Sequence, residues 1–208
     1  MLIVGLTGNI ASGKSTVAAE LSARGATIVD SDSAARAAVA PGTAALGAIV
    51  THFGREMLLA DGTLDRAALG RLIFADRDAR RALERIVHPA VEAARLDAIA
   101  AARSLDAAMV VCDIPLLFEA HLAWQFARIV LVDAPAELRV ARMVRNRGMR
   151  ADDADARVRA QMAAALKRPR SDVIVDNAGD RAALMVRVDV VWDRLRVWAA
   201  VAAPVRAA

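Results

Sequence analysis

Gly8-Asn9-Ile10-Ala11-Ser12-Gly13-Lys14-Ser15 is the stretch that decides the fold of this chain. It matches the pattern G-x-x-x-x-G-K-[ST], in which backbone N–H groups surround a phosphate and glycines stand where side chains would block its approach. The apolar run Leu2–Thr7 before it predicts a buried strand, and Lys14–Arg24 after it predicts a helix. A strand, a loop and a helix in this order are the context that a phosphate-binding loop (P-loop) requires.

Two residues of this loop carry the expected chemistry. Lys14 is expected to bridge the β- and γ-phosphates of ATP, and the Ser15 hydroxyl is expected to bind Mg²⁺. Only two of the 28 Lys/Arg residues are lysines, Lys14 and Lys167. A compact ammonium reaches phosphate oxygens in a tight loop where a planar guanidinium fits poorly, so the lysine at position 14 indicates a specific need. We therefore expect a phosphotransferase that uses ATP and Mg²⁺.

The remaining strand patterns predict an α/β protein, a three-layer P-loop kinase fold with a five-stranded parallel sheet. Each is a β-branched or aliphatic run that ends in an acidic residue. They are Thr27–Asp30, Met109–Asp113, Arg128–Asp133 and Asp172–Asp176. The separation between the second and third strands is too long for one crossover helix, and its patterns predict helices near Ser33–Val39, Asp65–Phe74, Asp76–Ile86 and Pro89–Leu105.

We expect a single domain with two additions. Its core would comprise residues 1–32, 107–136 and 171–208, and a helical acceptor-binding insertion would span 33–106. A helical lid would span 137–170, with one helix from Pro135 toward Arg147 and a second over Asp152–Leu166. A stripe of large apolar residues predicts a last helix on the sheet, with Leu184, Val188, Val191, Leu195 and Trp198 facing the core.

Positive charge is concentrated in the predicted lid. Between Arg139 and Arg170 there are ten Lys/Arg and three Asp, an excess of seven in a chain whose net charge is +4. A solvated helix face usually mixes signs, so this excess predicts a lid that closes over a triphosphate. The cations that could contact the phosphates are Arg142, Arg145 and Arg147.

Composition argues against several other classes of protein. Aromatic residues make up 3% and tyrosine is absent, so base stacking on nucleic acid is not expected. No apolar stretch is long enough to span a membrane, and Met1 is followed by no basic leader. A single cysteine, Cys112, agrees with a reducing compartment. We expect a cytoplasmic enzyme for a small-molecule substrate, a monomer or weak homo-oligomer, with no nucleic-acid or membrane partner.

Several acids are candidates for catalysis. Asp30 and Asp32 end the second strand, where ligands of open parallel sheets collect. Asp32 is either the N-cap of the next helix or the carboxylate that orients the attacking hydroxyl and accepts its proton. Asp113 either helps to line an acceptor pocket or binds the Mg²⁺ shell through water. His88 taken alone is typical of a cap or a surface group.

The chain resembles the dephospho-coenzyme A kinase family over Leu2–Gly179, because several motifs agree in order. The most specific is Asp113-Ile114-Pro115-Leu116-Leu117-Phe118-Glu119, which P-loop kinases in general lack. The others are Val4–Thr16, Val29–Asp32 with Arg36, Phe53-Gly54, Asp61–Arg66, Ile86–Pro89, the lid residues Arg142, Ala154 and Gln161, and Asp172–Gly179. The family usually places Arg and then Asp or Asn before the lid glycine, whereas this chain has Asn146-Arg147-Gly148, so Arg145 and Arg147 stand as alternatives to Arg142.

The resemblance implies ATP-dependent phosphorylation of the ribose 3′-hydroxyl of dephospho-coenzyme A, the last step of coenzyme A biosynthesis. It implies that Asp32 and Lys14 are the catalytic residues, with Asp32 as the general base, and that Asn177 lies next to the adenine. The implied ATP-binding residues are Gly8, Ala11, Ser12, Gly13, Lys14, Ser15, Thr16, Arg142 and Asn177. The implied acceptor-binding residues are Asp32, Arg36, His88, Pro115, Leu116, Leu117 and Glu119.

Two other functions share parts of this pattern. A kinase for another small acceptor, such as a nucleoside monophosphate, would share the loop and the lid but not Asp113–Glu119. A nucleotide-dependent switch that reads guanine needs Asn-Lys-x-Asp, and Lys167 is the only lysine outside the loop and does not stand in that motif.

Overall fold

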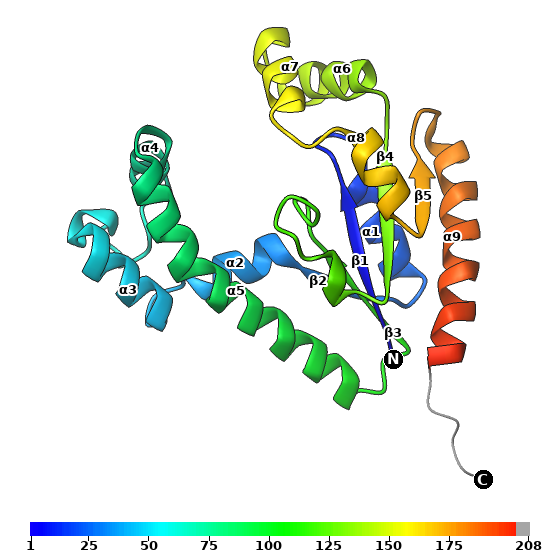
Figure 1. The fold of residues 1–208 in the computed structure, drawn as a ribbon, viewed down its shortest axis with the longest axis horizontal. Helices are drawn as coiled ribbons and strands as arrows, with labels where there is room; N and C mark the ends of the chain where they lie inside the picture. Colours follow the sequence, from blue (N-terminus) through cyan, green and yellow to red (C-terminus); the bar gives the residue numbers. More distant parts are fainter. Residues whose placement is uncertain (203–208) are drawn as a thin grey trace. The chain divides into compact units, whose positions relative to one another are not determined.

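The computed structural model describes residues 1–202, in which five strands form one sheet of order β2-β3-β1-β4-β5 (Figure 1). β1 pairs in parallel with β3 and with β4, and β4 pairs in parallel with β5. The strands are β1 (Leu2–Gly8), β2 (Thr27–Asp30), β3 (Met109–Asp113), β4 (Arg128–Asp133) and β5 (Val173–Asp176). The predicted α/β class and parallel sheet are confirmed, and each strand begins and ends within one residue of its predicted bounds.

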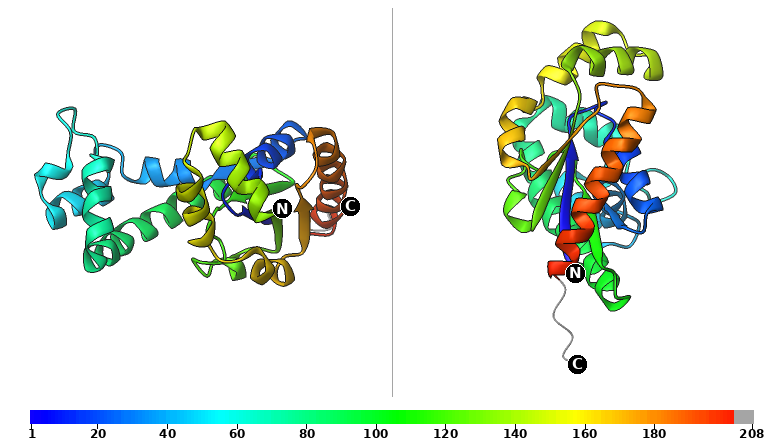
Figure 2. Two further views of the ribbon diagram at one scale, coloured as in Figure 1. Left: turned by 90° about the horizontal axis from the view of Figure 1, so that it is seen from above. Right: turned by 90° about the vertical axis from the view of Figure 1, so that its right-hand side faces the viewer.

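Two helices cover one face of the sheet, α1 (Lys14–Ala23) and α9 (Arg181–Ala202). Buried residues of both helices pack with residues of β1, β3, β4 and β5 in one apolar cluster. The right-hand view of Figure 2 looks onto α9 where it lies over the strands. The stripe predicted for the last helix is confirmed, since Leu184, Val188, Val191 and Leu195 are buried and Trp198 packs against the same cluster.

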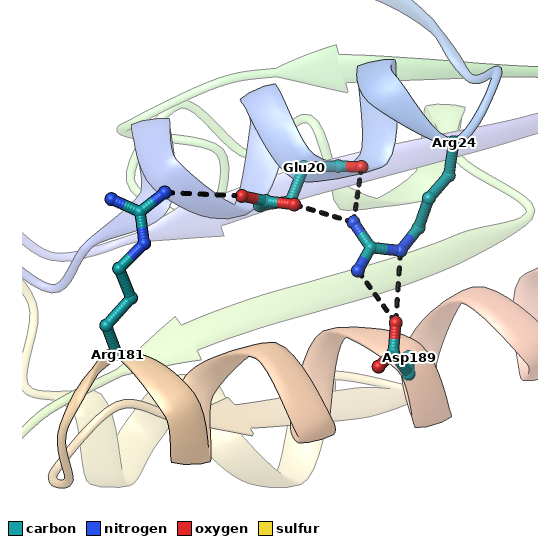
Figure 3. A network of polar contacts seen from close by, with 4 residues as sticks. All are labelled: Glu20, Arg24, Arg181 and Asp189. Carbon is teal, nitrogen blue, oxygen red and sulfur yellow. Dashed lines mark hydrogen bonds and ion pairs between the residues drawn. The ribbon is translucent and has the colours of Figure 1, made fainter.

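Ion pairs join α1 to α9 along their outer edges (Figure 3). The Arg24 guanidinium lies between the carboxylates of Glu20 and Asp189, with N–O distances of 2.7 Å to each. Arg181 adds a contact of 3.6 Å to Glu20 from the first turn of α9. The hydrogen bonds that Arg24 donates to Glu20 and, second in size, to Asp189 raise the pKa of Arg24 above its usual value. These partly exposed pairs contribute little stability compared with the apolar cluster that the two helices share.

The segment between β2 and β3 is helical, as predicted, but its helices differ from the expected ones. They are α2 (Ser31–Ala38), α3 (Ala44–Phe53), the short 3-10 helix η1 (Arg55–Met57), α4 (Arg66–Ala75) and α5 (Arg77–Ser104). Helix α3 was not predicted; Thr43 caps it by accepting from the Leu46 N–H at 3.2 Å. The break predicted before Pro89 is wrong, because α5 is continuous through that residue. Apolar residues on both sides of Pro89, among them Ile86, Val87 and Ala90, pack on one cluster, and this burial outweighs the lost hydrogen bond.

The segment predicted to be a lid, here still called the lid, is a helical hairpin followed by a short helical segment. Its elements are α6 (Ala136–Arg147), α7 (Ala151–Arg159), α8 (Ala164–Lys167) and η3 (Arg168–Arg170). The second predicted lid helix is therefore wrong in its length, since α7 ends at Arg159. Gln161 and Met162 leave the helix and make hydrogen bonds to the phosphate-binding loop and to Glu119. The last short element, η2 (Ala123–Gln125), lies between β3 and β4.

The chain divides into two compact units. One unit is Asp30–Ala101, and the other is Met1–Val29 together with the described residues from Ala102 onward. Within residues 1–202, no helix combines the length and the apolar character that crossing a membrane demands.

We expect Gly5→Ala to destabilise the sheet unit, because an added Cβ would lie 2.6 Å from Leu117 Cδ1 and 3.0 Å from the Phe126 ring. Both neighbours are buried, so overpacking should cost about 1–3 kcal/mol. Chemical denaturation measures this loss. Gly47→Ala is the matched control, because the helical Gly47 has no atom within 4 Å of its added Cβ and the change should stabilise by about 0.5–1 kcal/mol. Equal denaturation midpoints for Gly5→Ala and wild type would contradict the close packing of β1 against this turn.

Candidate active site

The phosphate-binding loop, Gly8–Ser15, leaves the N-terminus of α1 open. Gly13 is the N-cap residue, with φ of 96°, and no side chain caps the helix. Two backbone hydrogen bonds form turns here: the Ser12 N–H donates to Asn9 O at 3.0 Å, and the Thr16 N–H donates to Gly13 O at 3.0 Å. An uncapped helix start presents N–H groups and partial positive charge, which together favour a bound anion. The local geometry is thus that of an anion-binding loop, as the sequence predicted.

Neighbouring segments make glycine necessary at two loop positions. A Cβ at Gly8 would lie 2.5 Å from Val132 O of β4 and 2.6 Å from Ser12 Oγ. A Cβ at Gly13 would collide with the side-chain amide of Asn177, and the positive φ there is itself strained for other residues. The glycines are therefore required by protein packing as well as by the space that a phosphate needs.

Lys14 forms an ion pair with Asp113, the last residue of β3. Both side chains are largely buried, with 14% of Lys14 and 10% of Asp113 exposed. β3 is the neighbour of β1 in the sheet, so the carboxylate and the lysine meet at the carboxyl edge. This ion pair fixes the position of the Lys14 ammonium. It also places Asp113 among the residues that surround the phosphate-binding loop.

Arg142 and Asn177 support the loop from the lid and from the end of β5. The Arg142 guanidinium donates to Asn177 O at 2.8 Å and to Ala11 O at 3.3 Å. The Asn177 side chain donates to Ser12 O at 2.7 Å. Burial lowers the pKa of Arg142, and repulsion from Arg145 adds to the effect. Because Arg142 meets carbonyl oxygens in these contacts, which carry no full charge, its positive charge is not neutralised by them.

Of the three lid arginines, the structure brings Arg142 to the loop. Arg145 and Arg147 are exposed, and the Arg145 guanidinium hydrogen-bonds to the side chain of its neighbour Asn146 at 3.1 Å. The lid's positive excess is also partly engaged within the protein: Arg139 and Lys167 are buried. Arg168 pairs with Asp133 at 2.5 Å, and that hydrogen bond raises the pKa of Arg168.

The turn after β3 contains four of the predicted acceptor-binding residues, and they differ in exposure and in their contacts. Thr7 Oγ1 donates to Pro115 O at 3.2 Å, which attaches the turn to β1. Leu116 is 48% exposed, whereas Leu117 is fully buried against Gly5. Leu117 therefore packs against β1 inside the protein and is not exposed to a ligand. Glu119 pairs with Lys167 at 2.8 Å, so its carboxylate is already engaged inside the protein.

Asp32, Arg36 and His88 belong to the other unit, and all three side chains are exposed. Asp32 and Arg36 lie on α2, and His88 lies on α5. The N-cap of α2 is Asp30, whose carboxylate accepts the Asp32 N–H at 3.0 Å. The capping interpretation of Asp32 is therefore wrong, because α2 begins two residues earlier than expected and Asp30 supplies the cap.

Sequence reasoning named Gln161 and Glu119 but missed the contacts by which residues after α7 join the phosphate-binding loop. The Ile10 N–H donates to Gln161 Oε1 at 2.7 Å, and Asn9 Nδ2 donates to Met162 O at 3.0 Å. Lys167 lies at the far end of these contacts, beside Glu119. One signal was present: Lys167 is the only lysine besides Lys14 in a chain that otherwise uses arginine.

The loop fits a Mg²⁺ ion that is shared with a nucleotide. Ser15 stands in the first turn of α1 and is exposed, so its hydroxyl is accessible. Residues 1–202 contain no cluster of three or more His, Cys, Asp or Glu that could hold a metal ion. Mg²⁺ commonly takes one or two protein ligands and completes its shell with phosphate oxygens and water, so one accessible hydroxyl next to a phosphate-binding loop fits this ion.

Comparison with known proteins agrees with this geometry. The curated dephospho-CoA kinase of Thermobifida fusca is 44% identical over 196 residues, covering 94% of this chain and 97% of that protein. The dephospho-CoA kinase of Anaeromyxobacter dehalogenans is 47% identical, covering 91% and 90%. The crystal structure of the Thermus thermophilus protein TT1252 has a TM-score of 0.79 at 36% identity, covering 93% of this chain and 97% of that chain. Residues 2–183 match the family described as Dephospho-CoA kinase, and the chain therefore belongs to the dephospho-CoA kinase family.

Proposed function

We propose that this chain transfers the γ-phosphoryl group of ATP to the ribose 3′-hydroxyl of dephospho-coenzyme A, giving coenzyme A and ADP. Family membership supports the substrate. The observation that carries the reaction type is the open loop with Lys14: its ammonium lies beside Asp113 at the carboxyl edge of the sheet, next to an uncapped helix N-terminus. These groups together favour binding of a triphosphate whose terminal phosphoryl group can react.

The loop and the lid would act mainly through charge. As the γ-phosphoryl group transfers, negative charge spreads over its oxygens, and preorganised cations and N–H donors stabilise it. Lys14 is the cation of the loop, and Arg142 is the lid cation that touches it. Bound phosphate oxygens would compete with Asp113 for the Lys14 ammonium, so Asp113 holds the lysine in place until nucleotide arrives.

Asp32 is the proposed general base, which orients the 3′-hydroxyl and accepts its proton. Its carboxylate is exposed, and the capping contact of α2 is made by Asp30 instead. Arg36, His88, Pro115 and Leu116 are proposed to bind the acceptor. A carboxylate on a solvent-facing helix start is available to a substrate without first breaking a structural hydrogen bond.

Further parts of the proposal concern the metal, the architecture and the setting. Mg²⁺ would bind the Ser15 hydroxyl and ATP oxygens, where it would neutralise phosphate charge. Residues 33–106 would bind the acceptor, and residues 137–170 would close over ATP as a lid. The enzyme is proposed to work in the cytoplasm on small molecules, as a monomer or weak homo-oligomer.

Lys14→Ala should lower kcat by about 10²-fold or more, because it removes charge stabilisation at the transferring group. A coupled ADP-release assay with dephospho-coenzyme A measures this. Lys14→Arg is the informative companion, because it keeps the charge but replaces a compact ammonium with a planar group, and we expect it to be impaired as well. Near-normal turnover by Lys14→Ala with an unchanged circular-dichroism spectrum would rule out this loop as the ATP site.

Asp32→Asn should lower kcat by about 10²- to 10⁴-fold, the usual contribution of a general base, while the melting temperature stays unchanged. Asp30→Asn is the matched control two residues away, since asparagine caps helices about as well as aspartate and should preserve both stability and turnover. Steady-state kinetics and thermal denaturation of the two variants decide the matter. If Asp32→Asn kept more than about half of the wild-type kcat, Asp32 would not be the base.

Arg142→Ala should weaken ATP binding by about 10- to 100-fold, the range for loss of charge-assisted hydrogen bonds. Arg145→Ala, three residues along the same helix and exposed, should change the dissociation constant by less than about 2-fold, since exposed charges contribute little. Isothermal titration calorimetry with ATP·Mg²⁺ gives both constants. A larger loss for Arg145→Ala than for Arg142→Ala would reverse the assignment of the lid arginine.

A further inference from the structure

The segment Gln161–Arg170, here called the strap, contacts three loops at the carboxyl edge of the sheet. Lys167 pairs with Glu119 after β3, and the Arg170 guanidinium lies 4.7 Å from the centroid of the buried Phe118 ring. Arg168 pairs with Asp133 at the end of β4 and lies 3.7 Å from Asp176 at the end of β5. Lys167 and Arg170 therefore contact the turn after β3, and Arg168 contacts the ends of β4 and β5.

Lys167 differs from the other cations of the strap because it is fully buried. Its side chain is fully buried, while Nζ lies 2.8 Å from Glu119 Oε1. The pair is close in distance, yet within the described residues no acceptor meets Nζ in hydrogen-bonding geometry, and Glu119 Oε2 is likewise buried without a hydrogen-bond partner. Burying a charged pair with incomplete hydrogen bonding is costly, and an apolar pair of similar volume is often at least as stable. Stability alone therefore does not explain a lysine and a glutamate at these positions.

The pair leads directly to the phosphate-binding loop through Met162. Glu119 Oε1, which pairs with Lys167, also accepts the Met162 N–H at 3.2 Å. The carbonyl of the same Met162 accepts from Asn9 Nδ2 at 3.0 Å. The adjacent Gln161 accepts the Ile10 N–H at 2.7 Å. Two consecutive loop residues, Asn9 and Ile10, are thus held by two consecutive strap residues whose position the Glu119 carboxylate fixes.

We propose that Lys167 is a positioning residue for ATP: its buried ammonium fixes the Glu119 carboxylate, which holds Gln161-Met162 against the phosphate-binding loop. Glu119 acts in this arrangement through the loop and not as a contact to the acceptor. The inference rests on the proposed function only in that ATP is the ligand of the loop. Displacement of reacting groups by about 1 Å can cost about 10²-fold, so loss of this support should be visible in ATP kinetics.

The test is the apolar double variant Lys167→Met/Glu119→Leu. It removes both charges together, so it leaves no unpaired buried charge and should keep the melting temperature, while Met162 N–H loses its acceptor. We expect the KM for ATP and the calorimetric Kd for ATP·Mg²⁺ to rise by about 10-fold, with the KM for dephospho-coenzyme A changed by less than about 2-fold. Arg159→Gln is the matched control, because it removes a cation of the same basic segment whose ion pair is with exposed Asp155; it should change neither constant.

Three outcomes overturn the inference. A double variant that keeps its melting temperature and binds ATP like wild type shows that the pair is only structural. A rise confined to the KM for dephospho-coenzyme A shows that Glu119 contacts the acceptor. If the double variant does not fold, Gln161→Ala takes its place, since that partly exposed residue holds Ile10 directly, and an unchanged Kd for ATP would then refute positioning by the strap. Failure of the wild type to phosphorylate dephospho-coenzyme A would refute the proposed function alone, because the ATP titrations do not depend on the acceptor.

Discussion

The first turn of α1 must stay uncapped if its N–H groups are to bind phosphate. The neighbouring segments must therefore hold the loop in place by other contacts. The missing side-chain cap costs roughly a few tenths of a kcal/mol, because the N-cap residue is a glycine, here with positive φ. The surrounding segments compensate. Val132 of β4, Asn177 after β5 and Arg142 of the lid all contact the loop backbone or the space beside its glycines. The loop is therefore shaped by tertiary contacts more than by its own sequence.

The sheet order explains why those contacts converge. β1 lies at the centre, between β3 and β4, and each neighbour ends at the same carboxyl edge. β3 delivers Asp113 to Lys14 on one side, and β4 delivers the carbonyl beside Gly8 on the other. Parallel strands place their functional ends together, so residues distant in sequence become neighbours with little need for long loops.

Much of this could be predicted from the sequence, because strong local patterns decided it. β1 is an apolar run that leads into the phosphate-binding loop, the other four strands are predicted from aliphatic runs that end in an acid, and Lys14 is conspicuous in a chain rich in arginine. The parts that failed depend on tertiary packing. Pro89 is tolerated within α5 because partly buried apolar residues on both sides pack against one cluster, which no local rule reveals. Asp30 and Asp32 are the same residue type and could cap a helix equally well. Asp30 is the cap because α2 begins at Ser31. The break after α7 follows from bonds between Gln161-Met162 and a loop about 150 residues earlier, bonds of a range that local propensity does not report.

The Asn177 amide that occupies the space behind Gly13 has a consequence for biosynthesis. It joins Ser12, in the loop after β1, to a residue 165 positions later that directly follows β5. During translation the first strand, the loop and α1 leave the ribosome long before Asn177 is made. The nascent chain thus lacks the side chain that contacts Ser12 until residue 177 has been synthesised. Completion of the loop is thereby tied to synthesis of β5 and the residue after it, so that a product truncated before Asn177 does not acquire the finished loop.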